Sequence, residues 1–389
     1  MKDTTKSIRI QTERTQHKEH ATPLFLTSSF TFEDAAEGQA LFNNEIPGNI
    51  YSRYSNPSVQ EFIDKVCMLE QMEVGFATSS GMAAVFAGFA AHLKSGDHLV
   101  ACNALFGSAH QIITQILTKW GISHTYLDAT ATEEEWHAAV QENTKMVYLE
   151  TPSNPGLALV DLEMIGRVAK KHGLIYYVDN CFATPVIQKP GYFGADLIVH
   201  SATKFMDGQG RVLGGIIVGT PETMEPVIFF CRHTGPAMSP FNAWVLSKSL
   251  ETLHLRMERH CSNAEKLAHA LQGLPGVKKV NYPFLDSHPQ VELAKKQMKS
   301  GGALVTFELE GGFDRIVKFT QLLMIPSKTS NLGDSRTTIT NPNTTTHSKV
   351  AQELKNVLGI SEGLMRVSVG LEDIDDLIED FTQAISGSN

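Results

Sequence analysis

The chain has 389 residues, of which 33 are Lys or Arg and 42 are Asp or Glu, giving a formal net charge of -9. Its 42% hydrophobic and 19% charged residues exclude a disordered or fibrous protein and are typical of a globular chain with two or three domains. The acidic balance argues against a nucleic-acid-binding protein. The most apolar stretch, 82–93, is too short to cross a bilayer, so no membrane contact is expected.

The cysteines and histidines favour neither disulfides nor a metal site. The number of cysteines is odd and no two form a C-x-x-C pair, a pattern that fits the reducing cytoplasm. The first residues contain no apolar stretch typical of a secretion signal. The histidines are scattered, without an H-E-x-x-H motif, so we predict no metal ligands.

The first fifty residues are polar and have little periodicity, and we expect loops at 27–30 and 45–49. Residues 1–57 are therefore expected to form an arm without a core of its own. Such an arm would lie against another part of the molecule or against a neighbouring subunit. From about residue 58, short apolar runs alternate with helical stretches, which predicts a mostly parallel, doubly wound sheet. Strands are predicted at 98–102, 146–150, 175–178, 196–199 and 215–219.

One helix of this region is well marked by its ends. Asp161 is a candidate N-cap, and Gly173 follows three basic residues as a C-terminal stop. The chain is predicted to be helical again from residue 239, with a long helical connector at 246–260. Strands at 302–309 and 364–369 and a C-terminal helix follow. We therefore expect a cofactor- or ligand-binding domain at 58–250 and a smaller C-terminal α/β domain at 251–389.

The segment Ser201-Ala-Thr-Lys204 follows a predicted buried strand and precedes a glycine-rich stretch. Burial lowers the pKa of a lysine, which makes Lys204 a candidate Schiff-base nucleophile. The hydroxyl groups of Ser201 and Thr203 are suited to phosphate binding. Taken alone, the motif is more typical of an ordinary surface lysine in a loop.

Two further features point to the same edge of the sheet. Asp179 ends an apolar strand, where carboxylates of parallel strands face a ligand crevice and can pair with a pyridinium nitrogen. Gly81 and Met82 open an Ala-rich helix whose first N–H groups can bind phosphate. The alternatives are a helix-capping role for Asp179 and a simple capped helix after Ser80.

In combination, these segments resemble the Cys/Met-metabolism family of pyridoxal-phosphate enzymes over nearly the whole chain. The matching segments are YSRYSNP at 51–57, SSGMAA at 79–84, ETPSNP at 150–155, VDNCFATP at 178–185, HSATKFMDGQGR at 200–211, NLGDSRTTITNP at 331–342 and MRVSVGLED at 365–373. The resemblance implies the type I pyridoxal-phosphate transferase fold, with pyridoxal 5'-phosphate as cofactor. It also implies that Lys204 forms a Schiff base with the cofactor and that Asp179 pairs with the ring nitrogen.

The resemblance implies roles for further residues. The backbone of Gly81 and Met82 would hold the phosphate with Ser201 and Thr203. Tyr51 and Arg53 would reach the phosphate of the neighbouring subunit, so that the site needs a dimer, and two dimers would form a homotetramer. The remaining assignments are Asn154 to the phenolic oxygen of the cofactor, Arg366 to the substrate carboxylate and Asn331 as an aid to Arg366.

The chain departs from the family pattern at three positions. Phe106 stands where a tyrosine usually stacks on the cofactor ring, so Tyr51 or Lys204 would have to protonate a leaving group. Ser108 replaces the cysteine usual in methionine γ-lyases, and Ser330 replaces an acidic residue frequent in cystathionine γ-synthases. Within the family, the chain is most similar to the O-succinylhomoserine sulfhydrylases, which use sulfide to make homocysteine for methionine biosynthesis.

The same residues are also compatible with other activities. These are cystathionine γ-synthesis, methionine or cystathionine γ-elimination and, remotely, cofactor binding without catalysis. The acyl group is not determined either, and its carboxylate could be bound by one of three arginines, Arg211, Arg232 or Arg336.

Overall fold

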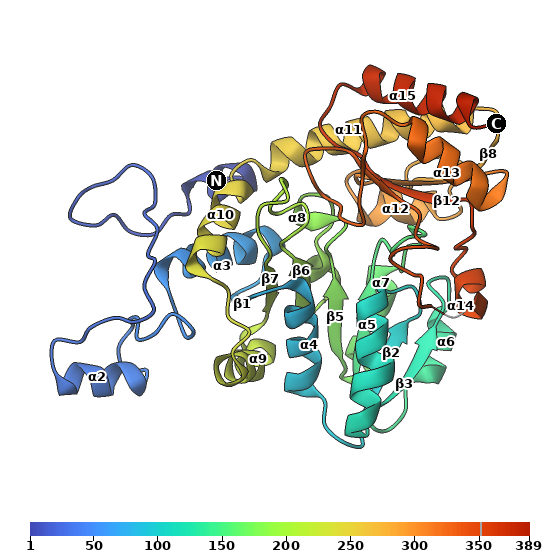
Figure 1. Cartoon of the computed structure of the whole chain (residues 1–389). Helices are drawn as coiled ribbons and strands as arrows, with labels where there is room; N and C mark the ends of the chain where they lie inside the picture. Colours follow the sequence, from blue (N-terminus) through green and yellow to red (C-terminus); the bar gives the residue numbers. More distant parts are fainter. Residues whose placement is uncertain (351) are drawn as a thin grey trace.

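The larger sheet has seven strands in the order β1-β7-β6-β5-β4-β2-β3 (Figure 1). Its pairs are parallel except those of β7, which runs antiparallel to both β1 and β6. This confirms the predicted mostly parallel α/β fold. The strands are β1 (Val74–Thr78), β2 (His98–Cys102), β3 (Ser123–Leu127), β4 (Thr144–Glu150), β5 (Ile175–Asp179), β6 (Leu197–Ser201) and β7 (Gly215–Gly219). The computed structural model describes residues 1–350 and 352–389.

The strands extend the predicted ranges at the edge that carries the candidate site. β5 includes Asp179, and β6 starts at Leu197 and continues to Ser201. The strand β3 was not predicted, because its sequence SHTYL is only partly apolar and its residues are intermediate or exposed at the sheet edge.

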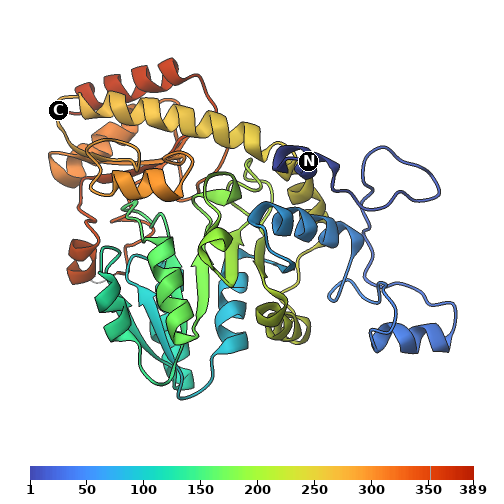
Figure 2. The same cartoon turned by 180° about the vertical axis from the view of Figure 1, so that it is seen from behind.

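Helices cover both faces of this sheet and enclose two apolar cores (Figure 2). The first core lies under α3 (Pro57–Glu70), α6 (Glu133–Ala139) and α7 (Leu162–His172). The second lies under α4 (Gly81–His92), α5 (Gly107–Gln111), η1 (Ile112–Ile116), η2 (Leu117–Trp120) and α9 (Pro221–Thr234). Asp161 caps α7 by accepting from Met164 N at 3.0 Å, and Gly173 ends the helix with a φ of 63°, as predicted. Short connections between strands form α8 (Thr184–Ile187) and η3 (Pro190–Phe193).

The smaller sheet has the strand order β10-β11-β12-β9-β8, and α11 (Leu253–Gln272), α13 and α15 pack on it (Figure 1). Asp373 caps α15, the predicted C-terminal helix. The elements are β8 (Val277–Asn281), α12 (Val291–Gln297), β9 (Leu304–Leu309), α13 (Gly312–Leu322), β10 (Ser327–Lys328), β11 (Thr338–Thr340), α14 (Gln352–Val357), β12 (Leu364–Ser368) and α15 (Ile374–Gly387). The domain limit near residue 250 stays a prediction. In the described part of the chain, no helix is long and apolar enough to cross a bilayer.

The connector is two helices rather than the one that was predicted. α10 (Pro240–Leu250) ends and α11 (Leu253–Gln272) begins with Glu251 and Thr252 between them. The Ser249 carbonyl accepts from Arg256 Nη2 at 3.0 Å. The same carbonyl accepts from Thr252 N at 3.2 Å, so the break between the two helices is closed by contacts from Thr252 and Arg256.

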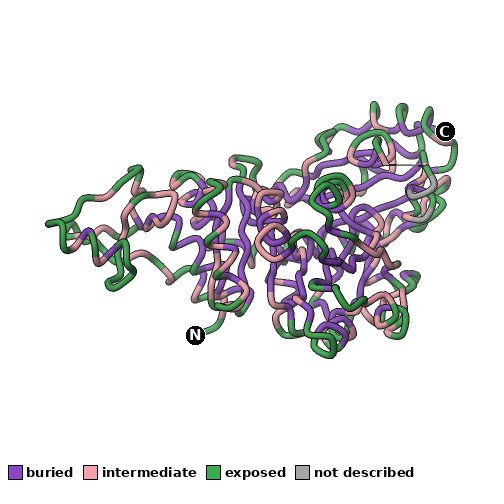
Figure 3. Tube along the Cα trace, turned by 90° about the horizontal axis from the view of Figure 1, so that it is seen from below, coloured by how far each residue is buried: buried purple, intermediate pink, exposed green. Residues whose placement is uncertain are grey.

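The stretches 27–30 and 45–49, predicted to be loops, contain no helix or extended strand, but two short helices of the arm were not predicted. The first fifty residues contain α1 (Asp3–Arg9) and α2 (Ala35–Phe42), and Asp34 caps α2 by accepting from Ala36 N and Glu37 N. The segment around α2 nevertheless extends from the body, and most of it is exposed or half-buried (Figures 1 and 3).

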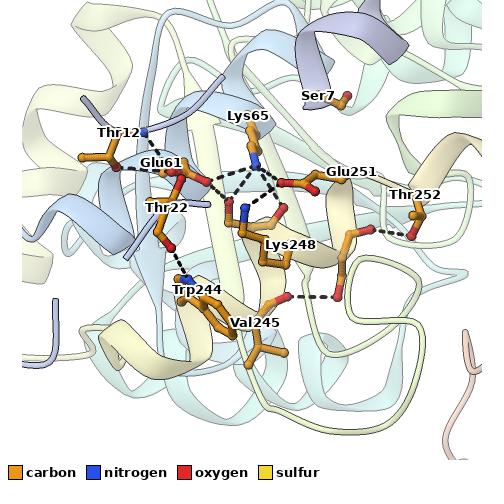
Figure 4. Close-up of polar contacts among 12 residues, drawn as sticks. Ser7, Thr12, Thr22, Glu61, Lys65, Trp244, Val245, Lys248, Glu251 and Thr252 are labelled. Atoms are coloured by element: carbon orange, nitrogen blue, oxygen red, sulfur yellow. Dashed lines mark hydrogen bonds and ion pairs between the residues drawn. The ribbon is translucent and has the colours of Figure 1, made fainter. Parts of the chain in front are cut away.

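The root of the arm is fixed by a buried polar network (Figure 4). Lys65 of α3 is fully buried and lies 3.1 Å from Glu61, 2.9 Å from the Ser247 hydroxyl and 3.4 Å from Glu251. Glu61 in turn accepts from Thr12 N at 2.9 Å. The segment around Thr12 is therefore held against α3 and α10.

Candidate active site

A cavity of about 330 Å³ lies at the C-terminal ends of β4, β5 and β6, beside the start of α4 and the segment before β11. Its walls come from parts of the chain that are far apart in the sequence. Of the predicted site residues it is lined by Gly81, Met82, Phe106, Asn154, Asp179, Ser201, Thr203, Lys204, Asn331 and Arg366.

Lys204 projects into this cavity, and its Nζ donates a hydrogen bond of 2.7 Å to Asn331 Oδ1. Burial lowers the pKa of Lys204, and the positive charge of Arg366 lowers it further. Since a neutral amide does not favour the ammonium as a carboxylate would, the amine is suited to nucleophilic attack on a carbonyl. Asn331 was predicted to assist Arg366, but the structure places its amide oxygen on Lys204.

Asp179 ends β5 and accepts a hydrogen bond of 2.9 Å from Cys181 N. Burial raises the pKa of Asp179 to about 6, against the lowering effects of the Cys181 N–H and of His200. A protonated ring nitrogen would give this buried carboxylate the positive partner that stabilises its ionised form.

The start of α4 forms a cradle suited to a phosphate. Ser80 caps the helix by accepting from Ala83 N at 3.2 Å, and the N–H groups of Gly81 and Met82 belong to the first turn, which lacks intrahelical acceptors. A Cβ at Gly81 would lie 2.6 Å from Ser201 Cβ, so only glycine allows this approach.

The hydroxyl group of Thr203 is less available for phosphate binding, because it is bonded to the backbone. Its hydroxyl donates to Gly214 O at 3.2 Å and accepts from Gly214 N at 3.1 Å. Thr203 lines the cavity but is held by the backbone.

Arg366 of β12 is 2% exposed and forms the wall opposite the sheet. Its Nη1 donates to Asn154 Oδ1 at 3.0 Å and its Nη2 donates to Ser330 O at 2.9 Å. Its Nε has no partner among the described residues. Burial lowers the pKa of Arg366 to about 10, although Glu150 acts to raise it. A buried guanidinium with a free N–H is a site for a carboxylate. Asn154, predicted to contact the cofactor, bonds Arg366 in this structure.

Glu150 was quoted only within a motif, yet it belongs to the site. It ends β4 directly beside Asp179 of β5, and its Oε2 accepts from Phe106 N at 2.8 Å. Burial raises the pKa of Glu150 well above its ordinary value, and the Asp179 charge adds to this. The sequence signal that identified Asp179, a carboxylate at a strand end, would also have identified Glu150.

The structure does not bring Tyr51 and Arg53 to the cavity of their own chain. Tyr51 is 42% exposed, and the Arg53 guanidinium lies 5.6 Å from its ring centroid and also bonds the Arg232 carbonyl. Their role in a neighbouring subunit stays a prediction.

The three candidate arginines for the acyl carboxylate also lie outside the cavity of their own chain. Arg232 lines a separate cavity beside Arg53, and the other two are engaged with Asp207 and Asp334.

Comparison with known proteins places this site in a family. The family described as Cys/Met metabolism PLP-dependent enzyme matches residues 4–386. The chain is 43% identical to O-succinylhomoserine sulfhydrylase of Pseudomonas aeruginosa, over 98% of this chain and 94% of that protein. It is 41% identical to L-methionine gamma-lyase of Fusobacterium nucleatum, over 94% and 93%.

A solved Campylobacter jejuni chain that contains N'-pyridoxyl-lysine-5'-monophosphate superimposes with a TM-score of 0.95, at 31% identity over 99% of this chain and 100% of the other. The cradle at Gly81, the strand-end Asp179 and the half-buried Lys204 are the groups that such a cofactor requires. The chain therefore belongs to the Cys/Met-metabolism family of enzymes that depend on pyridoxal phosphate.

Proposed function

We propose that the protein is a cytoplasmic O-succinylhomoserine sulfhydrylase. It replaces the acyloxy group of the ester with sulfide, giving homocysteine for methionine biosynthesis and releasing succinate. The observation that carries the proposal is Phe106, whose side chain lines the cavity at the position of the usual stacking tyrosine.

Phe106 favours an ester over a thioether substrate. An acyl group leaves as a carboxylate, whose conjugate acid has a pKa of about 4, so it needs no proton. A thioether leaves as a thiolate, whose conjugate acid has a pKa of about 8.5, and benefits from a general acid. A phenyl ring has no proton to donate, whereas a phenol at this position would have one.

Bound pyridoxal phosphate supplies an electron sink for the charge that develops when a proton leaves Cα. Asp179 would keep the proton on the ring nitrogen, and the start of α4 would bind the phosphate with Ser201. Lys204 would link to the cofactor, and its freed amine would move the Cα proton and then a Cβ proton, which allows the acyloxy group to leave Cγ as succinate. After sulfide has added at Cγ, both protons would be returned. Arg366 would bind the substrate carboxylate and orient the Cα–H bond, and Phe106 would lie against the cofactor ring.

The cavity favours sulfide over cysteine as the nucleophile. Among the described residues, the only carboxylates lining it are Glu150 and Asp179 at the strand ends. Asp334, the nearest acidic residue after Ser330, is paired with Arg336 at 2.9 Å. The ammonium of cysteine would therefore lose its hydration without gaining a partner, and this is costly, whereas sulfide needs no such partner.

The oligomer proposed with this function is a homotetramer of two dimers, in which Tyr51 and Arg53 complete the neighbouring site. Its support is the extended N-terminal segment, which leaves Tyr51 outside its own cavity. The main alternatives are cystathionine γ-synthesis and γ-elimination. The similarity to an L-methionine gamma-lyase supports γ-elimination as an alternative activity. Cofactor binding without catalysis is disfavoured because Lys204, Asp179 and Arg366 line one cavity.

The test is to give O-succinylhomoserine with sulfide and cysteine at equal concentration and to separate the products. We expect homocysteine as the main product and a lower rate with O-acetylhomoserine. Cystathionine as the main product would replace the proposal by γ-synthesis. Abundant 2-oxobutanoate would replace it by γ-elimination.

A further inference from the structure

A buried acidic residue lies on the face of the sheet opposite the cavity. Glu70 is the last residue of α3 and is fully buried, with 0% exposure. Its Oε1 lies 2.6 Å from His200 Nε2 and accepts from Asn180 Nδ2 at 2.8 Å. Its Oε2 has no partner among the described residues. A fully buried carboxylate needs a positively charged partner, and among the groups in contact with Glu70 the imidazole of His200 is the one that can carry such a charge.

The two partners of Glu70 adjoin the proposed cofactor-binding residues directly. Asn180 follows Asp179, and His200 precedes Ser201 by one residue and Lys204 by four. The parallel pairing of β5 and β6 places Asp179 opposite Val199, and Asn180 N continues it by donating to Val199 O at 3.1 Å. One carboxylate thus joins the C-terminal ends of the two strands.

Because side chains alternate along a strand, Glu70 contacts the ends of β5 and β6 from the face of the sheet opposite the cavity. Tyr177 and Val199 pack in the core under α4, whereas Val178 and Ile198 pack in the core under α3. Since successive side chains of a strand point to opposite faces, Asp179 faces the cavity side and His200 faces α3. The His200 ring, in contact with Glu70, therefore lies behind the Asp179 carboxylate, and a positive charge on this ring would lower the pKa of Asp179.

We propose that Glu70 and His200 form a buried ion pair that fixes the spacing of Asp179 and Lys204 and keeps Asp179 ionised for the cofactor ring nitrogen. Both are positioning residues, since neither lines the cavity. The inference rests on the proposed roles of Asp179 and Lys204, and it is independent of which nucleophile the enzyme uses.

The test compares Glu70→Gln and His200→Gln with the wild-type holoenzyme. Gln at position 70 keeps an acceptor for Asn180 but removes the charge. We expect both variants to bind the cofactor with an altered absorbance spectrum, because the ring nitrogen is held less firmly in its protonated form. The kcat should fall by about 10- to 100-fold, the range seen when outer partners of a site are removed, with KM changed less than about twofold.

The matched control is Glu61→Gln, a buried carboxylate in the same helix that pairs with Lys65 and contacts neither β5 nor β6. It should lower the denaturation midpoint but leave the cofactor spectrum unchanged. A wild-type spectrum and kcat in folded Glu70→Gln, or an equal spectral change in Glu61→Gln, would overturn the proposal. If Glu70→Gln does not fold, His200→Gln decides by the same readouts.

The variant Asp179→Asn distinguishes a failure of the ion-pair proposal from a failure of the role proposed for Asp179. If it alters the spectrum while the Glu70 and His200 variants do not, the ion-pair proposal fails and the role of Asp179 stands. If Asp179→Asn also has the wild-type spectrum and rate, the assigned role of Asp179 itself is wrong.

Discussion

Lys204 and Asn331 meet across the cavity, with Nζ and Oδ1 2.7 Å apart, although 126 residues separate them in the chain. The lysine lies between β6 and β7 of the larger sheet, and the asparagine precedes β11 of the smaller one. A neutral partner holds the amine in place without stabilising its charge, which suits a group that must attack a carbonyl.

Lys204→Ala should abolish turnover and the covalent attachment of the cofactor, because no other described lysine lines the cavity. Borohydride reduction of the wild type followed by peptide mapping should find the cofactor on Lys204. Lys328→Ala is the control, since Lys328 lies outside this cavity and bonds the Leu323 carbonyl. Recovery of the cofactor on Lys328 would refute the assignment.

Asp179→Asn should keep the covalent attachment and lower kcat by about 100-fold or more, since an amide cannot hold the ring nitrogen protonated. Steady-state kinetics and the absorbance of the bound cofactor measure the two effects. The control is Asp196→Asn, just before β6 and at the other edge of the sheet, where the carboxylate accepts from Tyr176 N; this change should alter kcat little. Near wild-type activity in Asp179→Asn would make Asp179 a structural residue.

Phe106→Tyr should raise γ-elimination from methionine by about tenfold or more, because it restores a phenol that can protonate a thiolate. The rate of sulfide replacement on the succinyl ester should change little, since the leaving carboxylate needs no proton. The release of 2-oxobutanoate measures elimination. Phe106→Leu, which removes the ring without adding a hydroxyl, should bring no gain. Equal elimination by the wild type and Phe106→Tyr would contradict the argument.

Mixing Arg53→Ala with Lys204→Ala should restore activity if Arg53 serves the neighbouring site. Random subunit exchange makes half of the dimers mixed, and each mixed dimer has one intact site, so about one quarter of the wild-type activity is expected. Each variant incubated alone under the same conditions is the control. Exchange that is detected by mass without any return of activity would show that the site is not shared.

Glu61→Gln should lower the free energy of unfolding by about 3–5 kcal/mol at neutral pH, because it leaves Lys65 buried without its closest ion-pair partner. Urea denaturation measures the loss. The control is Glu163→Gln, which removes an exposed ion pair with Lys296 and should lower the free energy of unfolding far less, because solvent screens an exposed pair. Equal losses of unfolding free energy in the two variants would contradict the claim that burial makes the Glu61–Lys65 pair important for stability.

The same variant predicts a pH dependence. Burial acts to raise the pKa of Glu61, but hydrogen bonds from Ser247 and Thr12 and the charge of Lys65 lower it from 4.5 to about 2. A lowered pKa stabilises the folded state above the ordinary value, and the contribution is lost as the pH falls toward the folded-state value. The stability gap between wild type and Glu61→Gln should therefore narrow between pH 4.5 and about 2.

Local sequence patterns determined much of the fold and the centre of the site. Asp161 and Gly173 marked α7 at both ends, because caps and stops act within one turn of a helix. Lys204 and Asp179 were identifiable because each stands at the end of a short apolar run, and the ends of parallel strands meet at one edge of a sheet.

Other features depended on contacts that no local pattern encodes. β7 pairs antiparallel with β1, which lies far earlier in the chain, and Arg256 near the start of α11 donates to Phe205 O at 2.6 Å across 51 positions. The pair of Glu70 and His200 joins residues 130 positions apart. A buried charge is tolerated only where the folded chain brings its partner to it, so such pairs are decided by tertiary structure.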